Sequence, residues 1–177
     1  GPVEPLERLV TVASLPSYLE MKVRLSCCSK SSEEVEIRLG KAEDMIMSSL
    51  GEWVYGKDND TLEGKVGELF LEKNKTLAVA ESCTGGLIGH RLTQTPGSSG
   101  YFLEGVVVYS NGAKNSRLGV SPPLIQKYGA VSEEVALAMA DGIRKTSGAD
   151  IGLSVTGVAG PDASNNKPVG TVFIAIS

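Results

Sequence analysis

Alternation of strands and helices begins at Leu77-Ala-Val-Ala-Glu-Ser-Cys-Thr-Gly-Gly86. The first four residues form a short apolar run, which is typical of a strand buried in a parallel sheet. The residues after it predict a turn into a helix over 84–95, which Pro96-Gly97 ends. Such a junction exposes unpaired backbone N–H groups and the positive end of a helix dipole. A polar side chain at this point is displayed at the edge of the sheet.

The rest of the second half continues the same alternation. Its sequence patterns predict strands at 105–109, 151–155 and 169–176, and helices at 113–118 and 132–147. Strands alternating with helices predict an α/β fold, here a three-layer α/β/α sandwich. A ligand of such a fold is expected at the carboxyl ends of the strands.

The first half predicts a small α+β unit with plainer chemistry. An alternating strand at 18–25 precedes a helix that Ser31 or Ser32 caps. Apolar residues recur at helical spacing through this helix, and Gly40 is a point where it could divide. Residues 53–55 favour a short strand. The next helix starts at Thr61, and the predicted domains are 1–58 and 59–177.

Bulk composition describes an ordinary globular chain. The 177 residues are 41% hydrophobic and 21% charged. No uncharged apolar run approaches the roughly 18 residues of a membrane span, and no export signal is visible. Because neither a membrane span nor an export signal is visible, we expect a cytoplasmic protein without membrane contact. The opening Gly1-Pro2 resembles the scar that a protease leaves when it removes a tag.

Metal sites and nucleic-acid surfaces are both disfavoured. The chain has three cysteines, of which Cys27 and Cys28 are neighbours, and a single histidine, His90. This set predicts no zinc site, and we expect neither a metal nor a cofactor. Free thiols fit a reducing cytoplasm. Residues 1–75 carry a net charge of −4 and residues 76–177 a net charge of zero, so neither half offers the basic surface that nucleic acid requires.

Ser82 is the candidate nucleophile at the strand-to-helix junction, where backbone N–H groups can hold an oxyanion. Gly85 and Gly86 lack side chains, so a substrate can approach the backbone. A simple helix N-cap and a phosphate cradle are alternative interpretations of this turn. His90 lies eight residues further along the predicted helix, about 12 Å away, and cannot serve Ser82. A lysine kept neutral by burial is the remaining usual activator.

Residues 76–177 contain four lysines, at positions 114, 127, 145 and 167. Lys114 follows the end of the strand at 105–109, so neighbouring parallel strands would bring it to the same sheet edge as Ser82. Lys145 ends a polar helix and Lys127 lies in a predicted turn. A lysine on an exposed helix surface is the alternative interpretation of Lys114, because any exposed helix carries lysines.

A third strand end carries Thr156, whose hydroxyl would point toward the same edge. Gly157 and Gly160 permit close approach to the backbone there. A tight loop with no role in catalysis is the simpler interpretation of this segment.

Six motifs, in order from about Leu62 to the end, resemble the CinA carboxy-terminal family, the nicotinamide-nucleotide amidohydrolases. They are Ala80-Glu-Ser-Cys-Thr-Gly-Gly86, Pro96-Gly-Ser-Ser99, Tyr109-Ser-Asn-x-x-Lys114, Gly129-Ala-Val-Ser132, Thr156-Gly-x-Ala-Gly-Pro161 and Lys167-Pro-Val-Gly170. The resemblance implies hydrolysis of nicotinamide mononucleotide to nicotinate mononucleotide and ammonia. This is a step of pyridine-nucleotide salvage that needs no metal.

The resemblance also implies roles for individual residues. Ser82 would be the nucleophile, Lys114 its base, Tyr109 a partner hydroxyl and Thr156 a substrate or oxyanion contact. Further substrate contacts are expected at Cys83, Thr84, Gly85, Gly86, Asn111, Gly157, Ala159, Gly160 and Lys167. The expected partners are the small-molecule substrate and a second copy of the chain in a homodimer.

Residues 1–58 resemble the small KH-like linker domain of full-length CinA proteins, in which a molybdopterin-binding-like domain comes first. The family continues past its last strand with a Gly-Asp-Arg segment and a closing helix. This sequence stops at Ser177, so the resemblance implies that the domain at 59–177 lacks its last strand or helix.

The alternative from another functional class is a nucleotide-binding or scaffold module in competence or the DNA-damage response. Release of ammonia from nicotinamide mononucleotide distinguishes the two.

Overall fold

The structure, a computed structural model, describes residues 6, 8–17, 20–163 and 166–177. The chain folds into two compact units, Gly1–Asn59 and Asp60–Ser177. The division falls one residue after the one predicted from the sequence. The Gly1-Pro2 dipeptide lies outside the described residues, as do the first two positions of the strand predicted at 18–25.

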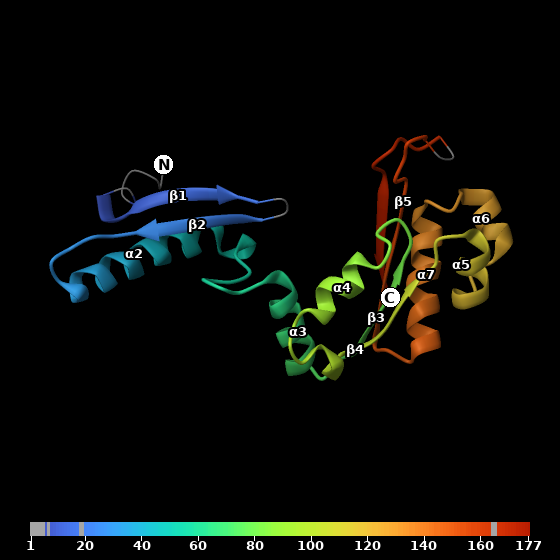
Figure 1. The fold of residues 1–177 in the computed structure, drawn as a ribbon, viewed down its shortest axis with the longest axis horizontal. Helices are drawn as coiled ribbons and strands as arrows, with labels where there is room; N and C mark the ends of the chain where they lie inside the picture. The colour runs from blue at the N-terminus through green and yellow to red at the C-terminus, as the bar shows by residue number, and fades with distance from the viewer. Residues whose placement is uncertain (1–5, 7, 18–19, 164–165) are drawn as a thin grey trace. The chain divides into compact units, whose positions relative to one another are not determined.

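The first unit contains a two-stranded sheet and one long helix (Figure 1). Strands β1 (Thr11–Pro16) and β2 (Met21–Ser26) are antiparallel, and β1 had not been predicted. Helix α2 (Ser32–Leu50) is capped by the Ser31 hydroxyl, which accepts a hydrogen bond from the Glu34 N–H. Gly40 does not divide α2. The unit's small apolar core gathers around Leu6, Val10 and Ala42.

The short strand predicted at residues 53–55 is wrong. Residues Gly51–Trp53 form a 3-10 turn, because the chain keeps a helical twist after α2 and the Gly51 N–H bonds to the Met47 carbonyl. Trp53 is 78% exposed, so no burial of its side chain favours an extended conformation.

The second unit is a mixed α/β fold around a four-stranded sheet of order β4-β3-β5-β6. The strands are β3 (Leu77–Glu81), β4 (Phe102–Val107), β5 (Ile151–Gly157) and β6 (Val172–Ile176). Strand β3 is parallel to both β4 and β5, whereas β6 is antiparallel to β5. Glu81 is level with Val107 and Val155. The carboxyl ends of the three parallel strands therefore meet at one edge.

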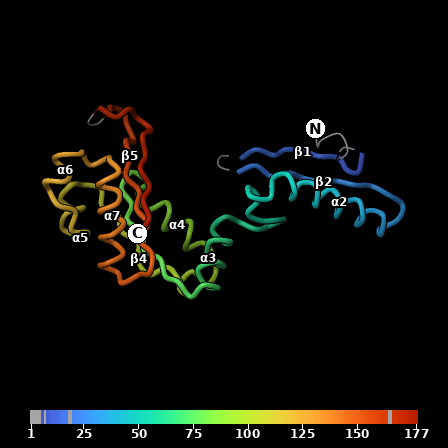
Figure 2. The backbone as a smooth tube through the Cα atoms, turned by 180° about the vertical axis from the view of Figure 1, so that it is seen from behind, coloured from blue at the N-terminus to red at the C-terminus, as the bar shows by residue number. Residues whose placement is uncertain are grey.

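Helices cover both faces of this sheet (Figures 1 and 2). Ala78 and Ala80 of β3 pack toward α5 (Asn111–Leu118), α6 (Pro122–Tyr128) and α7 (Glu133–Ser147). Leu77 and Val79, on the opposite face, pack toward α3 (Leu62–Glu72) and α4 (Leu87–Thr93). Side chains alternate between the faces of a strand, so a continuous apolar run is buried on both sides.

Two helix predictions need correction. Helix α4 begins at Leu87 and not at 84, because Gly85 and Gly86 take the positive φ angles of 62° and 101° and form a turn. Helix α6 occupies the segment around Lys127 for which the sequence predicts a turn. Its two prolines lie in the first turn, where their missing N–H groups cost nothing, and Ile125 is buried.

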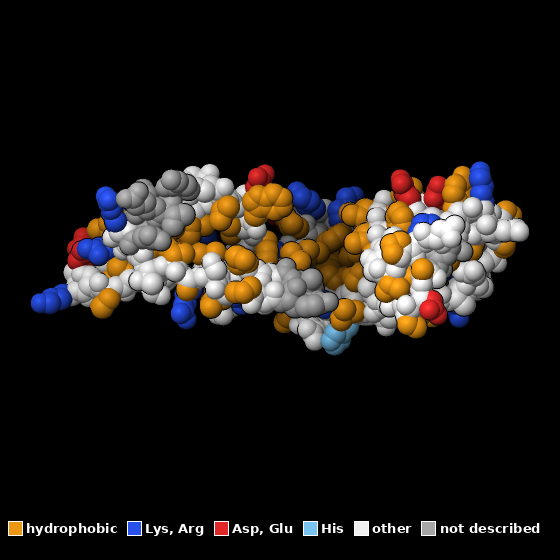
Figure 3. Space-filling model, turned by 90° about the horizontal axis from the view of Figure 1, so that it is seen from above, with side chains coloured by type: hydrophobic (Ala, Val, Ile, Leu, Met, Phe, Trp, Pro, Cys, Tyr) orange, Lys and Arg blue, Asp and Glu red, His pale blue; other side chains and the backbone are white. Residues whose placement is uncertain are grey.

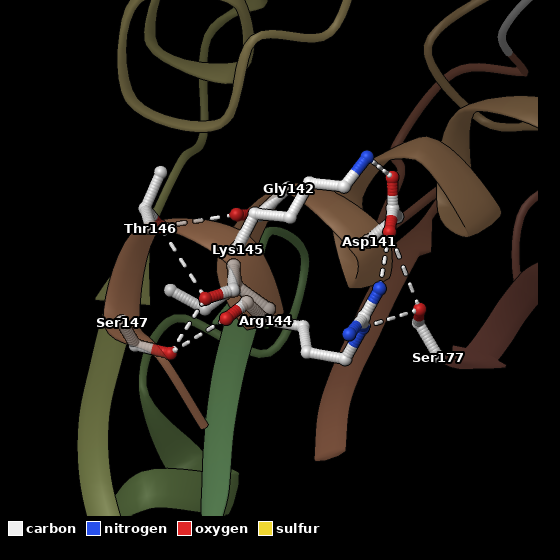
Figure 4. Close-up of polar contacts among 8 residues, drawn as sticks. Asp141, Gly142, Arg144, Lys145, Thr146, Ser147 and Ser177 are labelled. Atoms are coloured by element: carbon white, nitrogen blue, oxygen red, sulfur yellow. Dashed lines mark hydrogen bonds and ion pairs between the residues drawn. The ribbon is translucent and has the colours of Figure 1, made fainter. Parts of the chain in front are cut away.

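Helix α7 is fastened to the end of β6 (Figure 4). The Arg144 Nε donates to the Ser177 hydroxyl at 2.9 Å and its guanidinium pairs with Asp141 at 3.0 Å. Lys145 pairs with the same carboxylate. A Cβ at Gly152 of β5 would lie 2.1 Å from the Ala140 carbonyl, so the helix and the strand are in direct backbone contact. This packing holds the second half of α7 against β5 and the end of β6.

Apolar side chains remain on the surface of both units (Figure 3). On the outer face of β6 they are Val172, Ile174 and Ile176, while Ala175 faces α7. Within the described part of the chain, no helix is both long and apolar enough to cross a membrane.

Candidate active site

Ser82 lies directly after β3, at the edge where the parallel strands end. Its N–H donates to the Val155 carbonyl of β5 at 3.0 Å, and its own carbonyl accepts from the Gly85 N–H at 3.2 Å. The residue is buried. The sheet and the following turn therefore both hold the backbone of Ser82.

Lys114 lies in the first half of α5, whose N-cap Ser110 accepts a hydrogen bond from the Ala113 N–H. The Lys114 side chain runs inward, and the residue is 1% exposed. Its Nζ lies 3.0 Å from the Ser82 Oγ, 2.9 Å from the Val108 carbonyl oxygen and 3.1 Å from the Tyr109 carbonyl oxygen. The structure thus brings together the two residues that the sequence had separated by 32 positions.

These three contacts suit a neutral amine. A neutral lysine has two N–H donors and one lone pair, which match two carbonyl oxygens and one hydroxyl. Burial lowers the pKa of Lys114 below its ordinary 10.5, and the nearby Cys83 opposes this shift without reversing it. No carboxylate in the described residues pairs with this amine. Ser82 can therefore donate its hydroxyl proton to Lys114.

Cys83 is next to Ser82 but is poorly suited to be the nucleophile. Burial raises the pKa of its thiol, and the Glu81 charge adds to this effect. Lys114 and the N–H groups of Cys83 and Thr84 act in the opposite direction without reversing it. The thiol form dominates, whereas the thiolate is the reactive form of cysteine.

The hydroxyl groups of Thr156 and Tyr109 make no hydrogen bond to Ser82 or Lys114 in the described structure. The Thr156 hydroxyl is buried and donates to the Ala130 carbonyl at 2.9 Å, so it fastens the turn before α7 to β5. Tyr109 is 70% exposed and meets Lys114 only through its carbonyl oxygen. No hydrogen bond of its hydroxyl occurs in the described structure. A role for either hydroxyl in catalysis stays a prediction.

The glycines of the site allow its segments to approach closely. A Cβ on Gly157 would lie 2.8 Å from the Cys83 sulfur and 3.0 Å from the Thr171 carbonyl oxygen. The end of β5 therefore nearly touches the turn after Ser82. In that turn the Thr84 Oγ1 is buried without a hydrogen-bond partner among the described residues.

The other predicted contacts are more dispersed. Asn111 is the first residue of α5 and lines a cavity of about 1060 Å³ bordered by α5 and α6. Lys167 donates to the Tyr128 carbonyl, at 3.5 Å, and Tyr128 also lines this cavity. Ala159 and Gly160 are exposed in the loop after β5, and no hydrogen bond in the described structure joins them to Ser82 or Lys114. Their contact with substrate stays a prediction.

Sequence reasoning missed Glu81. Its buried carboxylate accepts hydrogen bonds from the N–H groups of Gly86, Ile88 and Gly89. These three donors at the start of α4 are therefore not free to hold a phosphate, and a phosphate cradle elsewhere in the turn stays a prediction. The sequence did carry a signal for a role of Glu81, because it is an acidic residue at the end of an otherwise apolar strand.

Histidine and metal chemistry are not assembled at this edge. His90 is exposed, is the pale blue side chain of Figure 3, and contacts Gln94 at 3.0 Å. No group of three His, Cys, Asp or Glu residues that could hold a metal occurs in the part of the chain that the structure describes.

Fold and site together define a mixed α/β protein with a buried serine–lysine pair where the parallel strands end. The family model for the CinA C-terminal domain matches residues 59–177, so the chain belongs to the CinA family. The match begins at residue 59, and the KH-like assignment of residues 1–58 stays a prediction.

Individual relatives agree with membership of the CinA family. A CinA-like protein of Chlorobaculum tepidum is 48% identical over 94% of this chain, and one of Geotalea uraniireducens is 47% identical over 95%. The chain spans 40% of the length of each of these relatives. The crystal structure of competence/damage inducible protein CihA from Agrobacterium tumefaciens has a TM-score of 0.63 and 40% identity, covering 70% of this chain and 75% of that one.

Proposed function

We propose that the second unit hydrolyses the carboxamide of nicotinamide mononucleotide to nicotinate mononucleotide and ammonia. One observation carries the proposal of an amidohydrolase. The Lys114 amine is buried, lies 3.0 Å from the Ser82 hydroxyl, and directs its other hydrogen bonds to two carbonyl oxygens. A serine next to a neutral lysine is an activated nucleophile. The choice of substrate rests on the resemblance of the six motifs.

In the proposed reaction, the Ser82 oxygen attacks the carboxamide carbon while Lys114 takes the hydroxyl proton. The N–H groups of Cys83 and Thr84 follow the nucleophile directly. In the described structure they are directed at the Cys83 sulfur, which is a weak acceptor. In the proposed reaction they bind the developing oxyanion instead. When the carbon–nitrogen bond breaks, Lys114 returns the proton to the departing ammonia. Water then attacks the acyl-enzyme, Lys114 takes its proton and passes it to Ser82, and nicotinate mononucleotide leaves.

A scaffold role without catalysis is supported only by the names of relatives, which refer to competence and damage induction. No contact at the site favours it. A buried, unpaired lysine is costly to keep and adds nothing to a scaffold.

The test is release of ammonia from nicotinamide mononucleotide by the purified chain, with nicotinate mononucleotide identified by chromatography against a standard. Ser82→Ala is the matched control, because it removes one oxygen from a buried site. Wild-type protein should release both products and the variant neither. A folded wild-type chain that releases no ammonia, or a variant as active as wild type, would refute the proposal.

A further inference from the structure

Glu81 is a buried carboxylate that the proposed reaction does not use. It is 2% exposed and is the last residue of β3. Its Oε2 accepts from the N–H groups of Gly86 and Ile88 at 3.0 and 3.1 Å, and its Oε1 accepts from the Gly89 N–H at 2.8 Å. Three charge-assisted hydrogen bonds to one side chain are a strong local restraint.

These bonds cap α4 from outside the helix. Gly86, the N-cap residue, has no side chain to cap with. The first N–H groups of a helix need acceptors, and the dipole favours a negative charge there. Because the Glu81 carboxylate fills this position, these three N–H groups already have an acceptor within the chain.

Glu81 therefore bridges the two ends of the turn that carries the nucleophile. At one end its backbone belongs to the sheet, where its carbonyl accepts from the Val108 N–H at 2.8 Å. At the other end its side chain grips the start of α4. The turn between them contains Ser82 and the N–H groups of Cys83 and Thr84. With both ends fixed, the turn has little freedom to move the Ser82 oxygen away from Lys114.

We propose that Glu81 is a positioning residue for Ser82, holding the turn so that the hydroxyl stays within reach of Lys114 and the next two N–H groups face the substrate. The amide-hydrolysis readout of this inference rests on the proposed function. The nucleophile's own reactivity provides a readout that does not.

The experiment compares Glu81→Gln with Glu133→Gln. Glutamine has the size of glutamate but only one acceptor oxygen, so at least one of the three N–H groups loses its partner. Glu133 is an exposed acidic residue in the first turn of α7 and loses the same charge without touching the site. Both variants are measured well below their unfolding temperatures, first for kcat and KM on nicotinamide mononucleotide.

The second measurement is the rate at which an alkyl fluorophosphonate labels Ser82, located by peptide mass spectrometry. In this step the serine oxygen–phosphorus bond forms, the phosphorus–fluorine bond breaks, fluoride leaves, and Lys114 takes the hydroxyl proton. We expect Glu81→Gln to lower kcat and the labelling rate by about 100-fold, the cost of a misplaced reacting group, with little change in KM. Glu133→Gln should match wild type in all three.

A folded Glu81→Gln protein with wild-type kcat and labelling rate would overturn the inference and leave Glu81 a residue of stability alone. Glu81→Asp, which keeps the charge but is one methylene too short to reach α4, is the second variant and should show the same loss. If neither variant folds even at low temperature, the positioning role is also rejected in favour of stability. If wild-type protein labels at Ser82 but releases no ammonia, the proposed function fails while this inference is still tested by the labelling rates.

Discussion

Replacement of Lys114 by arginine is expected to abolish nearly all turnover. The Lys114 Nζ has three oxygen neighbours within 3.1 Å and contacts no carboxylate among the described residues. Arginine stays protonated and has no lone pair, so it cannot take the Ser82 proton. Loss of a general base costs about 10²- to 10⁴-fold in rate, or about 3 to 5 kcal/mol of transition-state stabilisation. We expect the upper end, because the serine and its base act as a unit.

The dependence on pH has a definite sign. Burial lowers the pKa of Lys114 below 10.5, and only the neutral amine is a base. Wild-type kcat should therefore rise as the pH passes the folded-state pKa, whereas the arginine variant should show no such rise. Between that pKa and 10.5 the unfolded chain binds more protons than the folded one. The free energy of unfolding should consequently increase with pH in this window, and Lys114→Met should lose the increase.

Steady-state ammonia release from pH 6 to 9 supplies kcat and KM for each variant. Lys145→Arg is the matched control, because Lys145 is exposed on α7 and its ion pair with Asp141 survives the change. It should retain wild-type kcat. An arginine variant at position 114 that keeps kcat and loses only KM would make Lys114 a substrate-binding charge and refute the serine–lysine mechanism.

Three other predictions follow from single contacts. Cys83→Ala should retain most of the activity that Ser82→Ala abolishes, since burial raises the pKa of the Cys83 thiol, and the reverse pattern of kcat would reassign the nucleophile. Gly157→Ala should lower both kcat and the free energy of unfolding in urea, because its Cβ would lie 2.8 Å from the Cys83 sulfur. The loss of unfolding free energy should be about 1 to 3 kcal/mol. The control Gly40→Ala places a Cβ in open space within α2 and should be neutral or stabilising, so equal effects of the two substitutions would contradict crowding at Gly157. Hydrogen bonds from Thr76 lower the pKa of Asp150 to about 2 from 3.8, so its stabilisation should be lost as the pH falls through this range, and acid titration of Asp150→Asn should lack that component.

Local sequence predicted those elements whose signals agree with their surroundings. Helices α2 and α7 have serine caps and regular apolar spacing, and both begin at the predicted cap. Strand β3 is an apolar run long enough to be recognised by itself. Helix α6 differs from the turn that the sequence predicts around Lys127, because burial of Ile125, which stabilises the helix, is a tertiary contact. The start of α4 was misplaced, because glycines do not reveal which of them takes a positive φ.

For the candidate site, too, the sequence determined one part and the tertiary structure another. Sequence by itself determined that Ser82 and Lys114 follow neighbouring strands, because parallel strands end at one edge whatever the details of packing. Tertiary structure alone decided that the Lys114 amine is buried against two carbonyl oxygens, that the Thr156 hydroxyl turns to Ala130, and that Glu81 caps α4. The physical reason is that sequence periodicity reports local structure, whereas these contacts join residues that are distant in the sequence. Periodicity specifies the face on which a residue lies, but the partner of a long polar side chain depends on distances and burial that exist only after the strands and helices have packed.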